Sequence, residues 1–307
     1  MISLVVIGRN EAQNLQRCFN SIDREQFKQV IYVDSSSVDE SIKIVEDNYK
    51  FVQIIRLKSN YYSASLARFV GLKYVNSEYV QFLDGDMTLD KDWIKRSHSF
   101  LLKNKKVAIV HGYKFEYKDK NDLSKYKIKK DKANFQSDYL QGSYLARTLL
   151  LKKTGFLDIR MTGEEERDLY VRIRNLGFQV WYIDYMMASH YDFKSRGFRY
   201  VLFSPISVVI LLPLWKYLVS KFIFDYIFVY RYLLPQLLID LFTLFSLIIL
   251  SKELILIAII MQIFSLIFYF LLKRKGYWLI WKSSFLNIYR FNSLLNKKVV
   301  YSHSKKI

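Results

Sequence analysis

The sequence QVIYVDSSSVDESIKIVEDN, at residues 29–48, contains a strand, a loop and a helix in direct succession. Its opening QVIYV is an apolar run that predicts a buried strand. The loop after this strand is acidic and rich in serine. Ser37 and Glu40 have the spacing of a capping box, so we expect a helix to begin there and to continue to about Asn48. A buried strand followed by a helix is the repeating unit of α/β folds.

The same unit is repeated on both sides of residues 29–48. Further apolar runs of strand length occur at 4–7, 51–57 and 79–83. Helices are expected between them, the first opening at Asn10 and the last covering 63–75. This alternation predicts an α/β fold with a mainly parallel central sheet and helices on both faces. Such sheets bind ligands at the carboxyl ends of their strands, so the candidate site lies in the loops that follow the strands.

The loop after the fourth predicted strand holds two carboxylates, Asp84 and Asp86, on either side of Gly85. Residues two apart in an extended chain project to the same side, so the two carboxylates are expected to converge. Two hard oxygen ligands suit Mg²⁺ or Mn²⁺ bridging a diphosphate. An ordinary surface turn is the alternative, because Asp-Gly is a common turn dipeptide. The chain has no Gly-x-Gly-x-x-Gly and no Gly-Lys-Ser/Thr motif, which argues against a dinucleotide site and excludes a P-loop.

A second acidic cluster, EEERD, stands at the start of another predicted helix. Glu165 follows Thr162 at capping-box spacing, which gives Glu165 a structural role. Glu166 continues the apolar stripe of this helix to its start, where a carboxylate near the positive end of the helix dipole stays ionised and can accept a proton. Asp168 and Arg172 are i,i+4 partners and are expected to form an ion pair. Acidic residues that only decorate a helix start are the alternative.

The composition of the 307 residues excludes two classes of protein. With 51% hydrophobic residues the chain is too apolar to stay disordered, and one Cys cannot build a disulfide framework. The net charge of +19 is uneven, because residues 193–307 carry +13 and the first 192 residues only +6. The basic excess borders the longest apolar runs, which indicates an anionic membrane surface. No nucleic acid is expected as a partner, since these basic residues do not form an aromatic-studded soluble face.

The chain divides into four predicted parts. They are an α/β catalytic domain over 1–195, interfacial helices over 196–232, a transmembrane helix hairpin over 233–272 and a basic cytoplasmic tail over 273–307. Each apolar run of the hairpin is close to the length that crosses about 30 Å of hydrocarbon. Basic residues at both outer ends place those ends in the cytoplasm. Two buried core helices are the alternative for the hairpin, and residues 201–219 either lie on the membrane or form a third span.

Taken in chain order, these motifs resemble the family 2 glycosyltransferases, inverting enzymes with the GT-A type nucleotide-diphospho-sugar transferase fold, and in particular their membrane-anchored bacterial members. The stretch VDSSSVDES at 33–41 resembles the family's Val-Asp-x-Gly-Ser-Thr-Asp-Gly-Thr loop, and ARFVG at 67–71 its Ala-Arg-Asn-x-Gly. FLDGD at 82–86 resembles the D-x-D element. GEEERDLYVR at 163–172 resembles Glu-Asp-x-Asp-Leu-x-x-Arg, with Glu166 where the family has Asp.

The resemblance implies a role for each motif residue. Glu166 would be the catalytic base that deprotonates the acceptor hydroxyl, with Glu165 and Asp168 as possible supporting residues. The residues implied in binding the nucleotide sugar are Asn10, Glu11, Asp34, Arg68, Asp84 and Gly85. Asp86 and His190 would bind a divalent cation, Mn²⁺ or Mg²⁺.

The expected function is membrane-bound transfer of a sugar from a nucleotide-diphosphate sugar, of UDP type, to a hydroxyl of a lipid-linked saccharide or another cell-surface glycan. We expect the protein at the cytoplasmic membrane, in contact with anionic lipid, with the catalytic domain on the cytoplasmic side. Two alternatives are transfer of the sugar to polyprenyl phosphate and a non-enzymatic membrane-binding role. Residues 118–132 form a charged insertion that is either a flap over the acceptor site or a solvated helix.

Overall fold

The computed structural model describes residues 1–59, 61–117, 133–137, 139–159, 165–191, 234–271 and 299–303. The chain forms two compact units, which we call the sheet unit and the hairpin unit. The sheet unit comprises Met1–Ile159, Glu165–Ser195 and Lys297–Ile307, and the hairpin unit comprises Arg160–Glu164 and Arg196–Asn296. The predicted interfacial helices over 196–232, the insertion at 118–132 and most of the tail lie outside the described residues.

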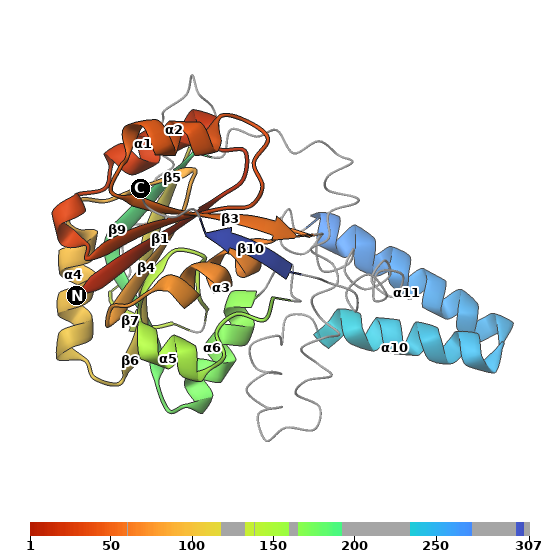
Figure 1. The fold of residues 1–307 in the computed structure, drawn as a ribbon. Helices are drawn as coiled ribbons and strands as arrows, with labels where there is room; N and C mark the ends of the chain where they lie inside the picture. The colour runs from red at the N-terminus through yellow and green to blue at the C-terminus, as the bar shows by residue number, and fades with distance from the viewer. Residues whose placement is uncertain are drawn as a thin grey trace. The chain divides into compact units, whose positions relative to one another are not determined.

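The first half of the sheet unit has the predicted alternation of strands and helices (Figure 1). Its elements are β1 (Ile2–Gly8), α1 (Ala12–Asn20), a 3₁₀ turn (Arg24–Gln26), β2 (Gln29–Asp34), α2 (Ser41–Asn48), β3 (Val52–Ser59), α3 (Ala64–Tyr74) and β4 (Tyr79–Asp84). The later elements are β5 (Met87–Leu89), α4 (Trp93–Lys103), β6 (Val107–Tyr117), β7 (Phe135–Gln136), β8 (Tyr144–Arg147), α5 (Thr148–Lys153), α6 (Glu165–Asn175) and β9 (Gln179–Tyr191). Figure 1 shows α1 and α2 on one face of the sheet and α3 on the other.

The sheet is mixed, so the prediction of a mainly parallel sheet is only partly right. In the described part of the chain the strand order is β10-β3-β2-β1-β4-β8-β6-β9-β5, with β7 paired to β9. Strands β3, β2, β1 and β4 are parallel, as expected from the helix between each pair of consecutive strands. Beyond β4 the direction reverses, since β8 is antiparallel to β4 and β5 is antiparallel to β9. Apolar periodicity identifies a strand but not its direction, which is why the reversal was not predicted.

The register of the parallel strands places three loops side by side. Gly8 at the end of β1 pairs with Asp34 on β2, and Ile7 pairs with Asp84 on β4. Side chains of β1 and β2 are almost completely buried, and each Val or Ile removed from water there stabilises the fold by about 1.5–3 kcal/mol. The apolar strands therefore fix the positions at which the two aspartates emerge.

The hairpin unit contains the two apolar helices that the sequence predicts. They are α10 (Leu234–Ile249) and α11 (Lys252–Leu271), and Gln262 Nε2 donates a hydrogen bond to Thr243 Oγ1 between them at 3.1 Å. No helix among the residues described in the structure combines the length and apolar character needed to cross a membrane. The helix hairpin is thus present, whereas its predicted transmembrane character is not supported.

A short strand near the chain end completes the sheet. β10 (Val299–His303) is antiparallel to β3, with Tyr301 opposite Leu57. The predicted basic tail over 273–307 therefore includes a strand that was not predicted. A strand in this position covers the backbone groups that β3 would otherwise expose at the sheet edge.

Candidate active site

Arg68 is at the centre of the candidate site. It lies on α3 with 2% of its surface exposed and bridges carboxylates from two other elements. Arg68 Nη2 is 2.8 Å from Asp84 Oδ1 at the end of β4. Arg68 Nη1 is 3.0 Å from Glu166 Oε1 and 3.5 Å from Glu165 Oε1 at the start of α6. One side chain thus joins the D-x-D loop to the EEERD cluster, which is far away in the sequence.

The charge of Arg68 is maintained by its partners. Burial alone would lower the pKa of the guanidinium, but Asp84, Glu166 and Glu165 outweigh burial and raise that pKa. The planar guanidinium presents several N–H donors in fixed directions, so it can hold two carboxylates at once, which an ammonium group does less well. Removing the guanidinium would leave these carboxylates facing one another without the cation that compensates them.

Gly142 makes room for this ion-pair cluster. A Cβ atom at this position would lie 2.5 Å from Arg68 Nη2 and 3.3 Å from Glu166 Oε1. The backbone just before β8 therefore approaches the guanidinium as closely as only glycine allows. Gly142 was not predicted as a site residue, and its local signal in the sequence is a glycine placed shortly before a strand-like run.

The loops after β1 and β2 are joined by reciprocal hydrogen bonds. Asn10 N donates to Ser37 Oγ at 2.9 Å, and Val38 N donates to Asn10 Oδ1 at 2.9 Å. Asn10 has a φ of 56°, a left-handed conformation that Asn tolerates better than most residues. Asn10 therefore does not cap α1, whose N-cap is Glu11 without a side-chain capping bond. Its amide instead sets the spacing between two loops of the site.

Asp34 stabilises the loop after β2 by accepting hydrogen bonds from within that loop. It is fully buried at the end of β2, and its Oδ2 accepts from Ser37 N at 2.9 Å. Its Oδ1 accepts from the Ser37 hydroxyl and, at 3.3 Å, from the Tyr32 hydroxyl. Burial and the Asp34 carboxylate raise the pKa of Tyr32, so this hydroxyl stays protonated and donates. Tyr32 and Ser37 were not predicted as site residues, because both contacts depend on the loop conformation.

Glu11 and Asp39 connect the same loops on the helix side. Glu11 is 7% exposed, and its Oε2 accepts from Asn14 Nδ2 at 2.8 Å. Asp39 accepts from Ala12 N at 3.1 Å and from the Ser41 hydroxyl at 2.5 Å. Burial tends to raise the pKa of Asp39, but the bonds from Ser41 and Ala12 prevail and lower that pKa. Helix α2 accordingly begins at Ser41 rather than at the predicted Ser37 capping box.

The D-x-D loop is a tight turn that carries both carboxylates. Gly85 N donates to Ile7 O at 2.8 Å, and a Cβ at Gly85 would lie 3.2 Å from that same oxygen. The turn is thus pressed against the end of β1. The two aspartates of this turn have different partners, because Asp84 contacts Arg68 whereas Asp86 contacts His190.

Asp86 and His190 form the candidate cation-binding pair. His190 Nε2 is 3.1 Å from Asp86 Oδ2, and His190 pairs with Met87, the residue after Asp86, in the β5–β9 ladder. Asp86 Oδ1 is buried and has no hydrogen-bond partner among the described residues, as expected of an oxygen that binds a cation. No group of three or more His, Cys, Asp or Glu side chains in the described ranges is arranged to hold a metal. Mg²⁺ typically takes only one or two carboxylates and completes its shell with water and substrate phosphates, so the pair fits such an ion.

The remaining acidic residues have different surroundings. Glu165 is 5% exposed and faces Arg68, while its predicted capping partner Thr162 lies outside the described residues. Asp168 is fully buried and forms the predicted ion pair with Arg172. Arg172 Nη1 also donates to Thr154 O at 2.6 Å, so this pair fastens α6 to the end of α5. Among the three, Glu166 has the most exposed carboxylate, with 19% of its side chain accessible.

The arrangement of these residues agrees with a known protein family. Residues 3–159 match the model of "Glycosyl transferase family 2", which is about half of the chain. The chain belongs to glycosyltransferase family 2. The matched region contains Asn10, Asp34, Arg68 and the D-x-D loop, and it ends before Glu166 and His190. The α/β sheet unit therefore has the GT-A type fold that the motifs implied.

Individual relatives agree with this family. The chain is 27% identical over 126 residues to the poly(ribitol-phosphate) beta-N-acetylglucosaminyltransferase TarP of Staphylococcus aureus. The matched region covers 39% of this chain and 38% of TarP. The chain is 28% identical over 163 residues to an uncharacterized glycosyltransferase of Haemophilus influenzae, covering 51% and 62% of the two chains. The structure of S. aureus TarS residues 1–349 in complex with UDP-GlcNAc superposes with a TM-score of 0.53 at 18% identity, covering 63% of this chain and 59% of TarS. These matches span less than two thirds of each relative's length, and the TarS likeness concerns the fold alone.

Proposed function

We propose that this family 2 glycosyltransferase transfers a sugar from a nucleotide-diphosphate sugar to an acceptor hydroxyl, with inversion at the anomeric carbon. The observation that carries the proposal is the Arg68 bridge, in which one buried guanidinium holds both the D-x-D carboxylate Asp84 and the carboxylate Glu166. A donor-binding group and a general base must stand close together for an in-line displacement. The bridge provides that proximity.

The donor is proposed to be a UDP-sugar. The loops after β1, β2 and β4 meet at the carboxyl edge of the parallel strands, where nucleotides bind in α/β sheets. The TarS structure with UDP-GlcNAc has the same fold, which supports this type of donor. Asn10, Glu11 and Asp34 would surround the base and ribose, and Asp84 and Gly85 would lie beside the ribose and diphosphate.

Asp86 and His190 would hold Mn²⁺ or Mg²⁺. The orphaned oxygen Asp86 Oδ1 supports this assignment. When bound, such an ion stabilises the negative charge that develops on the departing nucleoside diphosphate. The protein itself contributes the orientation, since His190 pairs with Met87 in the β5–β9 ladder and Tyr191 N donates to Asp86 O at 2.9 Å.

Glu166 is proposed as the general base. The acceptor oxygen forms a bond to the anomeric carbon as its proton passes to Glu166, while the bond from that carbon to the diphosphate oxygen breaks and the electron pair leaves with the diphosphate. Glu166 Oε1 is held by Arg68, and 19% of the side chain is open to solvent, so an acceptor can reach the carboxylate. A carboxylate in this position favours a hydroxyl acceptor over polyprenyl phosphate, which is already anionic and needs no base.

The acceptor is proposed to be a lipid-linked saccharide or another surface glycan at the cytoplasmic membrane, with the sheet unit in the cytoplasm. In the hairpin unit, large apolar side chains are exposed to solvent at both helices, among them Leu238, Ile248, Leu256 and Phe264 with 65%, 71%, 59% and 68% of their surface exposed. Apolar surface of this extent supports contact with lipid. TarP and TarS are named poly(ribitol-phosphate) beta-N-acetylglucosaminyltransferases, which also supports a polymeric acceptor.

The test is donor hydrolysis by the full chain in lipid nanodiscs. A panel of UDP-sugars is incubated with Mn²⁺, with Mg²⁺ or with EDTA, and released UDP is measured. We expect one sugar to be hydrolysed with either metal ion, and the rate to fall at least 100-fold with EDTA or in Asp86→Asn. If Asp86→Asn leaves both hydrolysis and Mn²⁺ affinity unchanged, the enzymatic proposal fails and the non-enzymatic alternative gains support.

A further inference from the structure

Tyr144 carries a buried hydroxyl without a partner beside the candidate active site. The residue is fully buried at the start of β8, and its Oη has no hydrogen-bond partner among the described residues. A hydroxyl that is left unpaired in a protein interior destabilises the fold, and phenylalanine would fill the same space without that cost. Packing of the ring therefore does not explain why this residue is a tyrosine.

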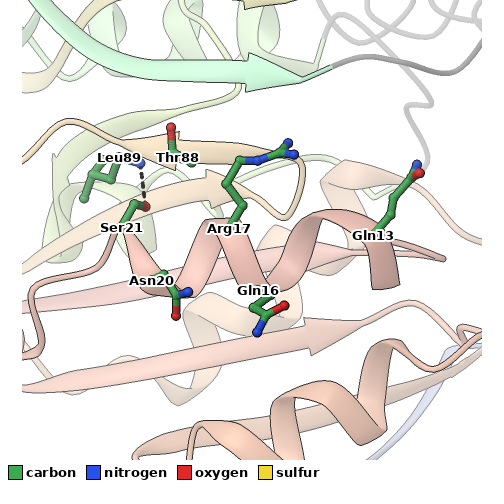
Figure 2. Close-up of a pocket in the computed structure, with 7 residues that line it drawn as sticks. All are labelled: Gln13, Gln16, Arg17, Asn20, Ser21, Thr88 and Leu89. Carbon is green, nitrogen blue, oxygen red and sulfur yellow. Dashed lines mark hydrogen bonds between the residues drawn. The ribbon is translucent and has the colours of Figure 1, made fainter. Parts of the chain in front are cut away.

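Other hydroxyls of the sheet unit show the usual situation. Tyr79 is almost as deeply buried as Tyr144, and its Oη accepts from Arg147 Nη1 at 3.1 Å. The hydroxyl of Ser21, directly after α1, accepts from Leu89 N at 3.0 Å (Figure 2). Since most buried polar groups in proteins are paired in this way, an unpaired one calls for a specific reason.

Strand β8 places Tyr144 on the face of the sheet that carries Asp84. Tyr144 is directly opposite Phe82 in the β4–β8 ladder, and the two ring centroids are 5.2 Å apart. Asp84 follows Phe82 by two residues along β4, so their side chains project to the same face. Two residues before Tyr144, a Cβ at Gly142 would lie 3.3 Å from Glu166 Oε1. The segment that leads into Tyr144 therefore passes directly by the Glu166 carboxylate.

The Tyr144 hydroxyl is influenced by the charges of the Arg68 cluster, by which we mean Arg68, Asp84, Glu165 and Glu166. Burial raises the pKa of the phenol well above its usual range, against the opposing effect of Arg68. The carboxylates of Glu166, Glu165 and Asp84 raise that pKa further. The phenol therefore stays protonated and remains a hydrogen-bond donor.

A bound nucleotide sugar would change the balance of charge in the Arg68 cluster. One guanidinium now faces three carboxylates. The diphosphate that is proposed to lie beside Asp84 adds negative charge and competes for the same N–H donors. A hydrogen bond from a neutral donor favours the ionised form of a carboxylate that loses part of its contact with Arg68. Tyr144 offers such a donor without adding charge.

We propose that Tyr144 is a positioning residue for the general base, and that in the donor-bound enzyme its hydroxyl donates a hydrogen bond to the Glu166 carboxylate. The bond orients Glu166 toward the acceptor oxygen and keeps the carboxylate ionised until it takes the proton. The inference rests on the proposed function and adds to it a residue outside the recognised motifs. Tyr144 touches neither donor nor acceptor in this role, so it acts only through Glu166.

The test compares Tyr144→Phe with the unsubstituted full chain in nanodiscs. UDP-sugar hydrolysis, in which water takes the place of the acceptor, gives kcat and KM. We expect kcat to fall at least tenfold, because general base catalysis contributes about 10²- to 10⁴-fold and part of it is lost. KM should change by less than threefold. The melting temperature should stay the same or rise, since the variant removes an unpaired buried hydroxyl.

Tyr79→Phe is the matched control. It also removes a buried hydroxyl, but one that has a partner and lies at the opposite end of β4 from Asp84. We expect the opposite pattern, a lower melting temperature with kcat retained within twofold. A further variant combines Tyr144→Phe with Glu166→Gln. Because Tyr144 acts through Glu166, the double variant should be no slower than Glu166→Gln alone.

Unchanged kcat in Tyr144→Phe would overturn the inference. A loss of kcat together with a lower melting temperature would do the same, because it would show a structural hydroxyl with a partner of its own, such as a buried water. An additional loss in the double variant would also reject it, since Tyr144 would then act independently of Glu166. Absence of hydrolysis of every UDP-sugar by the unsubstituted protein rejects the proposed function and this inference with it, whereas hydrolysis that Tyr144→Phe leaves unchanged rejects the inference alone.

Discussion

Arg68 and Asp84 form a 2.8 Å ion pair in which only 3% of the arginine side chain is exposed. Because the other edge of the same guanidinium contacts Glu166 at 3.0 Å, α3 fixes the distance between a carboxylate on β4 and one on α6. Neither the end of β4 nor the start of α6 forms the site alone. The arrangement depends on a tertiary contact between segments about 80 residues apart in the sequence.

Arg68→Met should destabilise the protein strongly. The substitution keeps most of the side-chain volume but leaves Asp84, Glu165 and Glu166 facing one another without a cation. Removing one partner of a buried ion pair costs about 3–5 kcal/mol. Denaturant unfolding at pH 7 measures the change. The matched control is Lys43→Met, whose ion pair with Glu40 is largely exposed and should contribute less than about 1 kcal/mol.

Arg68→Lys separates charge from geometry. The ammonium restores a positive charge in the cluster but cannot hold two carboxylates in the fixed directions of a guanidinium. We therefore expect part of the lost stability to return while UDP-sugar turnover stays at least tenfold below that of the unsubstituted protein. Full turnover in Arg68→Lys would show that charge alone, without the bridge, is sufficient.

Gly142→Ala should reduce activity more than stability. The added Cβ would lie 2.5 Å from Arg68 Nη2, so the guanidinium has to move and Glu166 moves with it. We expect at least a tenfold loss of turnover, because small displacements of catalytic groups are costly. Gly177→Ala is the control. Its φ of 79° makes alanine unfavourable by about 1 kcal/mol, but nothing lies within 4 Å of the added Cβ, so turnover should be retained.

The sequence was sufficient to predict those elements whose residue pattern is local. Strands β1 to β4 and the helices between them follow from apolar runs and spacing, and the i,i+4 pair of Asp168 and Arg172 is present as predicted. The functional motifs also lie where strand ends meet, because a parallel sheet places the carboxyl ends of its strands at one edge.

The contacts that assemble the site could not be predicted from local patterns. Gly142 has no periodic signal, and its closeness to Arg68 arises from the antiparallel pairing of β8 with β4. Ser37 was expected to cap a helix, but Asp34 and Asn10 compete for it once β1 and β2 are side by side. Strand direction and loop-to-loop hydrogen bonds depend on the whole sheet, and a single sequence window does not contain them.

Glu166→Gln tests the catalytic base. The amide has nearly the same size but cannot take a proton, so sugar transfer to a hydroxyl acceptor should fall by about 10²- to 10⁴-fold. Glu165→Gln is the neighbouring control. Glu165 also contacts Arg68, but only 7% of its side chain is exposed, so we expect Glu165→Gln to cause a smaller loss of transfer. Transfer to lipid extract with radiolabelled donor provides the measurement. If Glu166→Gln keeps more than a tenth of the rate, the acceptor nucleophile needs no base, as in transfer to polyprenyl phosphate.

His111 should make the fold sensitive to acid. It is fully buried on β6, with Gln141 Nε2 3.3 Å from its Nδ1 and the rings of Tyr139 and Tyr182 beside it. Burial lowers the pKa of His111 from 6.5 to about 3. Between these values the unfolded chain binds a proton that the folded protein does not, so stability decreases as the pH falls below about 6.5. From pH 7 to pH 5 this single group accounts for about 2 kcal/mol.

His111→Phe should remove that part of the pH dependence. The absolute stability of the variant can change at both pH values, so the quantity to compare is the difference in unfolding free energy between pH 7 and pH 5. We expect this difference to be about 2 kcal/mol smaller in His111→Phe than in the unsubstituted protein. His98→Phe is the control, because burial also lowers the pKa of His98 but this ring is only half-buried, and its effect should be smaller. An unchanged difference in His111→Phe would mean that the buried imidazole does not oppose protonation.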